Sequence, residues 1–160
     1  MARFRRFRRS YGSKGKRNSE RIVRAASSSV NANTQQTAYT YTATQACTVK
    51  SIKLDVGITA VIGGLTADGS NLPYALVVVR EGYEANALNY PALTDDLYNP
   101  TMDVLMSGVI TSSGVEDHKF NMIGRKLKRG DRLCLIVTYR PTDVSTAAIV
   151  SFEMNFSILT

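Results

Sequence analysis

Residues that could take part in catalysis are few and far apart in this chain. The single histidine, His118, lies between Asp117 and Lys119. One imidazole cannot supply the several histidine ligands of a catalytic zinc site, and no Gly-x-Ser-x-Gly segment supplies a serine nucleophile. The Gly-x₄-Gly-Lys-Ser/Thr loop that holds nucleotide phosphates is also missing. We therefore expect no enzymatic activity and no cofactor.

The two cysteines, Cys47 and Cys134, each lie within an apolar segment and lack the Cys-x-x-Cys spacing of redox and zinc sites. A pair of buried free thiols is the expected state. A disulfide between them is the alternative, and it would require that their two segments are adjacent strands.

Three short matches have ordinary explanations. Arg129-Gly130-Asp131 spells an integrin-binding tripeptide, but a tight turn favours Gly beside Asp in any case. Asn155-Phe156-Ser157 matches a glycosylation sequon inside a strong strand pattern. Asp95, Asp96 and Asp103 could hold calcium between subunits, but a solvated loop is the favoured explanation. We predict no metal site.

Basic residues are concentrated at the start of the chain. Residues 1–24 hold ten Lys and Arg against one acid, a net charge of +9, whereas residues 25–160 hold ten against twelve, a net charge of −2. Eight of the ten are arginines, whose guanidinium group binds phosphate in two places. We therefore predict that residues 1–24 are a nucleic-acid-binding arm, disordered or extended when free. The residues concerned are Arg3, Arg5, Arg6, Arg8, Arg9, Lys14, Lys16, Arg17, Arg21 and Arg24.

Aromatic residues between these arginines leave other interpretations of the arm open. Phe4, Phe7 and Tyr11 could stack on unpaired bases. The same three residues share one face of a helix, so a basic amphipathic helix on a membrane is an alternative. A solubilising tail, or a nuclear import signal alone, is another, and import is compatible with nucleic-acid binding.

The segment after the arm, residues 25–36, is small and polar without periodicity, and we predict a linker there. No apolar run approaches the roughly 18 residues that span a bilayer. No hydrophobic region of a secretory signal follows the first basic cluster. The 160 residues suit one domain.

From Thr37 onward, apolar residues alternate with a period of two. The phase slips at Lys50-Ser51, which predicts a β-bulge, and two segments are apolar on both phases, which predicts central strands. We therefore predict an all-β domain over residues 37–160, a jelly-roll sandwich of about eight antiparallel strands. An immunoglobulin-like sandwich shares this pattern. The predicted strands are 37–42, 47–56, 74–79, 104–110, 118–124, 132–139 and 148–158, with a possible eighth near 57–63.

A basic turn is predicted over residues 124–131, GRKLKRGD, with Gly130 at positive φ. Its cations, Arg125, Lys126, Lys128 and Arg129, are possible secondary nucleic-acid contacts.

The connection from Gly82 to Asp103 is long for a compact domain. Its tyrosines, Tyr83, Tyr90 and Tyr98, are candidates for a subunit interface, where this residue type is enriched. A self-packed Ω-loop is the alternative.

Four segments carry a resemblance to a known family: the arm ARFRRFRRSYGSKGKR, then TAYTYTATQACTVKSIKLDVG, GRKLKRGDRLCLIVTYRP and the terminal FSILT. Together they resemble the single-jelly-roll capsid proteins of small circular single-stranded DNA viruses, the circovirus-like and nanovirus-like group. The resemblance implies self-assembly of about sixty copies into the smallest (T=1) icosahedral shell, with the arms on a single-stranded DNA genome. It also implies nuclear import receptors as partners, a host-cell attachment factor of unknown identity, and location in the virion and, during assembly, the host nucleus.

A non-viral nucleic-acid-binding β protein with a basic tail is the alternative from a different class. Such a protein should carry basic residues on its folded surface, whereas residues 25–160 are net acidic. This balance favours the shell protein.

Overall fold

The computed structural model describes residues 18–63, 70–85, 102–111, 115–120, 124–142 and 146–160, with the backbone alone for Met102 and residues 115–120. These residues contain no helix that could cross a membrane. They form nine strands: β1 (Ser19–Asn31), β2 (Gln35–Thr42), β3 (Cys47–Ile62), β4 (Asn71–Val79), β5 (Met102–Thr111), β6 (Val115–Phe120), β7 (Arg125–Leu127), β8 (Arg132–Thr138) and β9 (Ala147–Leu159).

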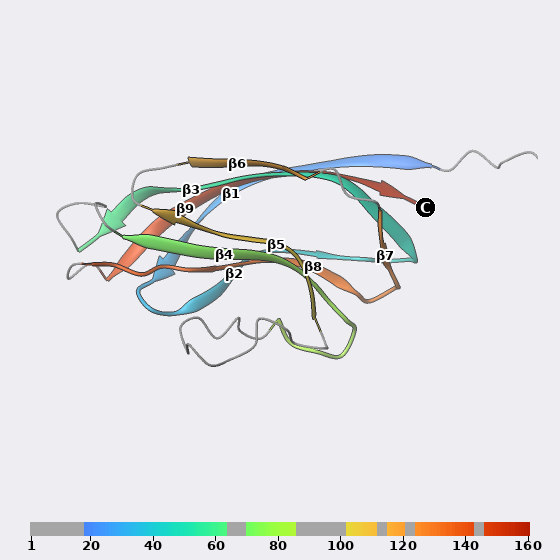
Figure 1. Ribbon diagram of the computed structural model, residues 1–160. Coiled ribbons are helices and arrows are strands. Elements are labelled where there is room, and N and C mark those ends of the chain that lie inside the picture. The colour runs from blue at the N-terminus through green and yellow to red at the C-terminus, as the bar shows by residue number, and fades with distance from the viewer. Residues whose placement is uncertain (1–17, 64–69, 86–101, 112–114, 121–123, 143–145) are drawn as a thin grey trace, which may run out of the picture.

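The strands form two antiparallel sheets, which lie against each other as the layers of a sandwich (Figure 1). The first sheet has the order β1-β9-β3-β6, and the short β7 pairs with β3 on the same edge as β6. The second sheet has the order β2-β8-β4-β5.

The pairing order identifies the sandwich as a jelly roll. With β7 set aside, β1 pairs with β9, β2 with β8, β3 with β6 and β4 with β5. The chain is thus one long antiparallel ribbon whose successive steps alternate between the two sheets, as in a jelly roll. An immunoglobulin-like sandwich would place the first two strands side by side, but β1 and β2 belong to different sheets. The predicted all-β jelly-roll fold is confirmed.

Alternate residues of β9 form the centre of the core, as the period-two pattern predicts. Ala148, Val150, Phe152, Met154, Phe156 and Ile158 are all buried. Tyr39 and Tyr41 of β2, in the opposite sheet, pack on two of them, with ring centroids 5.8 Å apart for Tyr39–Phe152 and 5.4 Å for Tyr41–Phe156. Such aromatic pairs add about 0.5–1.5 kcal/mol beyond the burial of their area, so they help to hold the two sheets together.

A second apolar cluster covers the outer face of the sheet that contains β4 and β8. Ala75, Val77, Val79, Cys134 and Ile136 are buried there. Both strands are therefore buried on both faces, as predicted for 74–79 and 132–139. Cys134 and the inward-facing Cys47 are free, buried thiols, which confirms that prediction as well.

The predicted bulge in β3 is also confirmed. The register between β3 and β9 shifts between Lys50 and Lys53, and Ser51 has a φ of +52°. Val49 before the bulge and Ile52 after it both enter the core, although an uninterrupted strand would point one of them outward.

Strand β1 corrects the predicted linker and moves the start of the folded body. Its pairing with β9 runs from Ser19 opposite Leu159 to Asn31 opposite Ala147. It therefore includes the end of the predicted 1–24 arm and most of the predicted 25–36 linker. The sequence pattern is weak because β1 is an edge strand with mostly small, exposed side chains. Only Ile22 and Val30 of its apolar residues pack into the core.

Two smaller predictions were also wrong. The possible extra strand near 57–63 is the continuation of β3 through Ile62. Strand β7 lies inside the predicted turn 124–131. The predicted strand 104–110 is present as the edge strand β5, on which Val104 and Val109 are exposed.

The left-handed backbone at Ser51 can be tested by substitution. Ser51→Gly should raise the free energy of unfolding by roughly 0.5–1 kcal/mol, and Ser51→Val should lower it by about 1–2 kcal/mol, because a β-branched side chain fits positive φ poorly. Urea unfolding of the purified chain, followed by circular dichroism, measures both changes. The matched control is Ser27→Val on the exposed side of β1, which should change stability by no more than about 0.5 kcal/mol. Equal losses from the two valine substitutions would contradict a special role of the bulge.

Candidate nucleic-acid interface

Asp131 holds together the turn that contains most of the predicted secondary contacts. Its side chain is almost completely buried. One carboxylate oxygen accepts hydrogen bonds from the Lys128 backbone N–H, at 2.9 Å, and from an Arg80 guanidinium nitrogen, at 2.8 Å. The other oxygen accepts from the Glu81 backbone N–H at 3.3 Å. Burial alone would raise the pKa of Asp131, but these bonds outweigh it and hold the pKa below its ordinary value.

Gly130 is required beside this carboxylate. Its φ is +87°, as the sequence predicts, and a Cβ atom there would lie 2.4 Å from the Glu81 side chain. The geometry also argues against integrin binding by the Arg129-Gly130-Asp131 tripeptide. The carboxylate that an integrin site would have to present is buried and fully engaged inside the protein.

Arg80 extends the network from Asp131 to Asp103. A second guanidinium nitrogen of Arg80 lies 3.0 Å from the Asp103 carboxylate, and the Arg125 guanidinium lies 2.5 Å from the same oxygen. Asp103 therefore pairs with two arginines, and a calcium ion there would have to displace them. Asp95 and Asp96 lie outside the described residues.

This network forms the centre of a basic region, which we call the basic end of the sandwich. Six of the ten Lys and Arg that follow residue 24 belong to it. Only two of the six form ion pairs with a carboxylate within the described part of the chain. Its members are Arg80, Arg125, Lys126, Lys128, Arg129 and Arg132.

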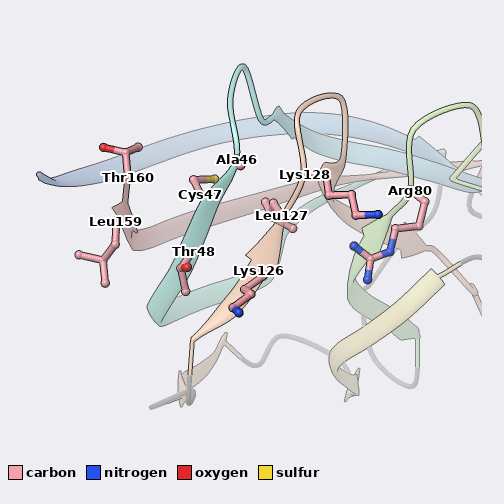
Figure 2. A pocket seen from close by; sticks show the side chains of 9 residues that line it. All are labelled: Ala46, Cys47, Thr48, Arg80, Lys126, Leu127, Lys128, Leu159 and Thr160. Atoms are coloured by element: carbon pink, nitrogen blue, oxygen red, sulfur yellow. The ribbon is translucent and has the colours of Figure 1, made fainter. Parts of the chain in front are cut away.

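An open cavity of about 670 Å³ lies at the basic end. Figure 2 shows the Lys128 side chain extending toward Arg80, and Lys126 on β7, the strand that ends directly before Lys128. Among the described residues, neither lysine has an acidic partner. Leu159 contributes a partly exposed apolar side chain to the lining, whereas Leu127, between the two lysines, is buried in the core. The lining residues are Ala46, Cys47, Thr48, Arg80, Lys126, Leu127, Lys128, Leu159 and Thr160.

The N-terminal arm leaves the sandwich beside this cavity. The Thr160 backbone N–H donates a hydrogen bond of 3.1 Å to the Asn18 carbonyl, and Ser19 pairs with Leu159. Figure 1 shows the start of β1, the C-terminal residue and β7 at the same end of the molecule. The point at which the basic N-terminal segment joins the body, Asn18, therefore lies beside the cavity of the basic end, which the sequence alone does not reveal.

The predicted arm residues divide into two groups. Arg21 and Arg24 lie on β1. Arg21 donates a hydrogen bond of 2.9 Å to the Asn155 side chain. Arg24 lies close to the Tyr39 phenol. Burial raises the pKa of that phenol, and the positive charge of Arg24 partly offsets the rise. These two residues therefore contact the folded body. The others lie outside the described residues: Arg3, Arg5, Arg6, Arg8, Arg9, Lys14, Lys16 and Arg17.

The remaining candidates are not brought together. Tyr83 is half exposed, and its carbonyl accepts a hydrogen bond from Arg132. Tyr90 and Tyr98 lie outside the described residues, so the subunit-interface prediction stays a prediction. The backbone of His118 pairs with that of Leu54 in the first sheet.

Among the predicted secondary contacts, Lys126 and Lys128 line the cavity, Arg125 is paired with Asp103, and Arg129 is exposed outside the lining. Arg80 was not among the residues predicted from the sequence. Its position as a charged residue directly after the buried strand 74–79 was the one sequence feature that could have indicated its role.

No family model matches the chain, and no curated protein matches it. Similar solved structures include two of infectious bursal disease virus. The Gx strain structure has a TM-score of 0.42 at 8% identity, covering 91% of this chain and 32% of that chain. The Gt strain structure has a TM-score of 0.40 at 8% identity, covering 91% and 33%. This chain thus spans about a third of the length of each, and the fold assignment depends on its own strand pairings.

The lowered pKa of Asp131 gives a pH-dependent prediction. Because the folded state favours the carboxylate, the stabilisation is fully present above the unfolded pKa, near 3.8, and is lost as the pH falls through the lower folded pKa. Asp131→Asn should lower the free energy of unfolding by about 1–3 kcal/mol at pH 7. The difference in unfolding free energy between this variant and the native chain should become smaller below about pH 4.

Urea unfolding at several pH values measures this difference. The control is Asp55→Asn, which breaks a more exposed pair with Lys53 and should lower the unfolding free energy by less than about 1 kcal/mol. A loss for Asp131→Asn that is the same at pH 7 and pH 3 would contradict the assigned role of the carboxylate.

Proposed function

We propose that this chain is the capsid protein of a small single-stranded DNA virus, whose jelly-roll body assembles into an icosahedral shell and whose N-terminal arm packages the genome. The observation that carries the proposal is the division of charge around the fold. Residues 1–17 hold eight basic residues and no acid, and they join a complete β-sandwich at Asn18. A jelly roll is one of the folds from which viral shells are built.

The arm suits a polyanion of any sequence. Each arginine or lysine placed on a phosphate releases a counterion, so binding is strong at low salt and independent of base sequence. About sixty arms of eight net charges would bring roughly 480 positive charges to a genome with one negative charge per nucleotide. That is substantial neutralisation of a genome of about one or two thousand bases. The same basic cluster would engage nuclear import receptors before assembly in the host nucleus.

The body suits contact between copies. Residues 25–160 have a net charge of only −2, so identical bodies repel each other weakly. Edge strands β1 and β5 expose the apolar side chains of Val23, Val104 and Val109. Contact with a second copy of the chain would remove these side chains from water. In the proposed shell of about sixty copies, the function of the folded body would be to form such contacts between copies.

One observation favours the alternative, a non-viral nucleic-acid-binding β protein with a basic tail. Such a protein should carry cations on its folded surface, and the structure gathers six at one end of the sandwich. Self-assembly separates the two functions, because only the shell protein must form closed particles of uniform size.

Electron microscopy of the purified full chain tests assembly directly. Uniform spherical particles are expected, together with a sedimentation coefficient that corresponds to many tens of subunits. A monomer at every protein and salt concentration would refute the shell proposal and leave the alternative.

Deleting residues 2–17 tests the arm without disturbing the fold. Co-purified nucleic acid should fall several-fold, measured by the ratio of absorbance at 260 and 280 nm, while circular dichroism and melting temperature stay unchanged. The comparison is a deletion of residues 2–24, which also removes Ser19–Arg24 from the β1–β9 pairing and should lower the melting temperature. The same amount of nucleic acid on the shorter deletion as on the full chain would contradict the role of the arm.

A further inference from the structure

We propose that the cavity at the basic end of the sandwich is a second nucleic-acid site, in which Lys126 and Lys128 bind backbone phosphates of the same single strand that the arm binds. This inference depends on the proposed nucleic-acid function and goes beyond it, since it places a binding site on the folded body. The ligand is identified by its chemistry, a phosphodiester strand with unpaired bases.

The charge of the lining points to an anion. Lys126 and Lys128 line the cavity with no acidic partner among the described residues, whereas the third cation, Arg80, is fixed by Asp131 and Asp103. An anion that enters the cavity meets two ammonium groups that no carboxylate of the described residues pairs with. Arg80 therefore serves to position the site, and the two lysines supply the free charge.

The size and the other lining residues point to more than a simple ion. A cavity of about 670 Å³ lies within the range of sites that hold a small organic ligand. Leu159 offers apolar surface for a sugar or a base, and the Thr48 and Thr160 hydroxyls can bond to phosphate or sugar oxygens. A nucleotide unit within a strand presents all of these groups together.

The place of the cavity points to the strand that the arm binds. Thr160, which lines the cavity, is hydrogen-bonded through its backbone to Asn18, where the arm begins. A polyanion held by residues 1–17 therefore passes near the cavity. Three of the four described ion pairs, those of Arg80 and Arg125 with Asp103 and Asp131, lie at this end, and none of them involves Lys126 or Lys128.

The first experiment compares salt dependence in the full chain. Binding of a 20-nucleotide oligothymidine is measured by fluorescence anisotropy between 0.05 and 0.5 M NaCl. Removing two phosphate contacts by Lys126→Gln with Lys128→Gln should reduce the slope of log K against log salt by about 1.4, or roughly tenfold in affinity near 0.15 M salt. The matched control removes two lysine charges outside the basic end, by Lys50→Gln with Lys53→Gln, and should change the slope by less than half as much. Equal changes in both double variants, or no change in the first, would overturn the proposal.

The second experiment identifies the ligand by lysine acetylation and mass spectrometry. With the oligothymidine bound, Lys126 and Lys128 should be protected at least several-fold while Lys50 stays reactive. Protection by thymidine monophosphate or inorganic phosphate alone at equal ionic strength would overturn the strand as ligand. Protection in nucleic-acid-free particles would instead assign the cavity to an acidic segment of another copy.

The arm lysines, Lys14 and Lys16, report separately on the proposed function. If they are protected by the oligothymidine while Lys126 and Lys128 are not, the cavity proposal fails and the role of the arm stands.

Discussion

The structure depends on the hydrogen bonding of β9 along both of its edges. A buried strand must satisfy every backbone N–H and C=O, because water cannot reach them. Strand β3 satisfies one edge of β9 and β1 satisfies the other, over the whole of Ala147–Leu159. This requirement draws the small, polar residues of β1 into the sheet despite their poor strand pattern. It also fixes the point at which the basic N-terminal segment leaves the body, beside the last residues of β9 and therefore beside the cavity.

The alternation of apolar and polar side chains predicts those strands in which one face is buried in the core and the other is not. The alternation from Ala148 to Ile158 predicts β9, and the phase slip at Ser51 predicts the bulge. Strand β1 could not be predicted in this way, because an edge strand with exposed alanines and serines has the composition of a linker. The choice between a jelly roll and an immunoglobulin-like sandwich also needed the pairing itself, since both arrangements produce the same alternation.

For the candidate site, the run of cations from Arg125 to Arg129 was visible in the sequence, but their different roles were not. Whether a cation is available depends on partners that are distant in sequence. Asp103 occupies Arg125 and Arg80, while Lys126 and Lys128 have no such partner among the described residues. Asp131 also looked like part of a tripeptide motif, and its actual role in closing the turn follows from Arg80, 51 positions earlier. The net charge of the body hid this arrangement, because it does not show which cations the acids Asp103 and Asp131 pair with.

The hydrogen bond between Thr160 and Asn18 sets a limit on distance. Whatever conformation residues 1–17 adopt, their first residue cannot lie farther than about 60 Å from Asn18. A strand held in the proposed cavity would therefore meet the arm of the same subunit as an intramolecular partner, at an effective concentration set by this short tether. In the proposed shell, each subunit would then hold one short stretch of the genome by two weak contacts, one through the arm and one through the cavity. Either could release and rebind without losing the strand, which would let a packaged genome rearrange inside a shell that stays closed.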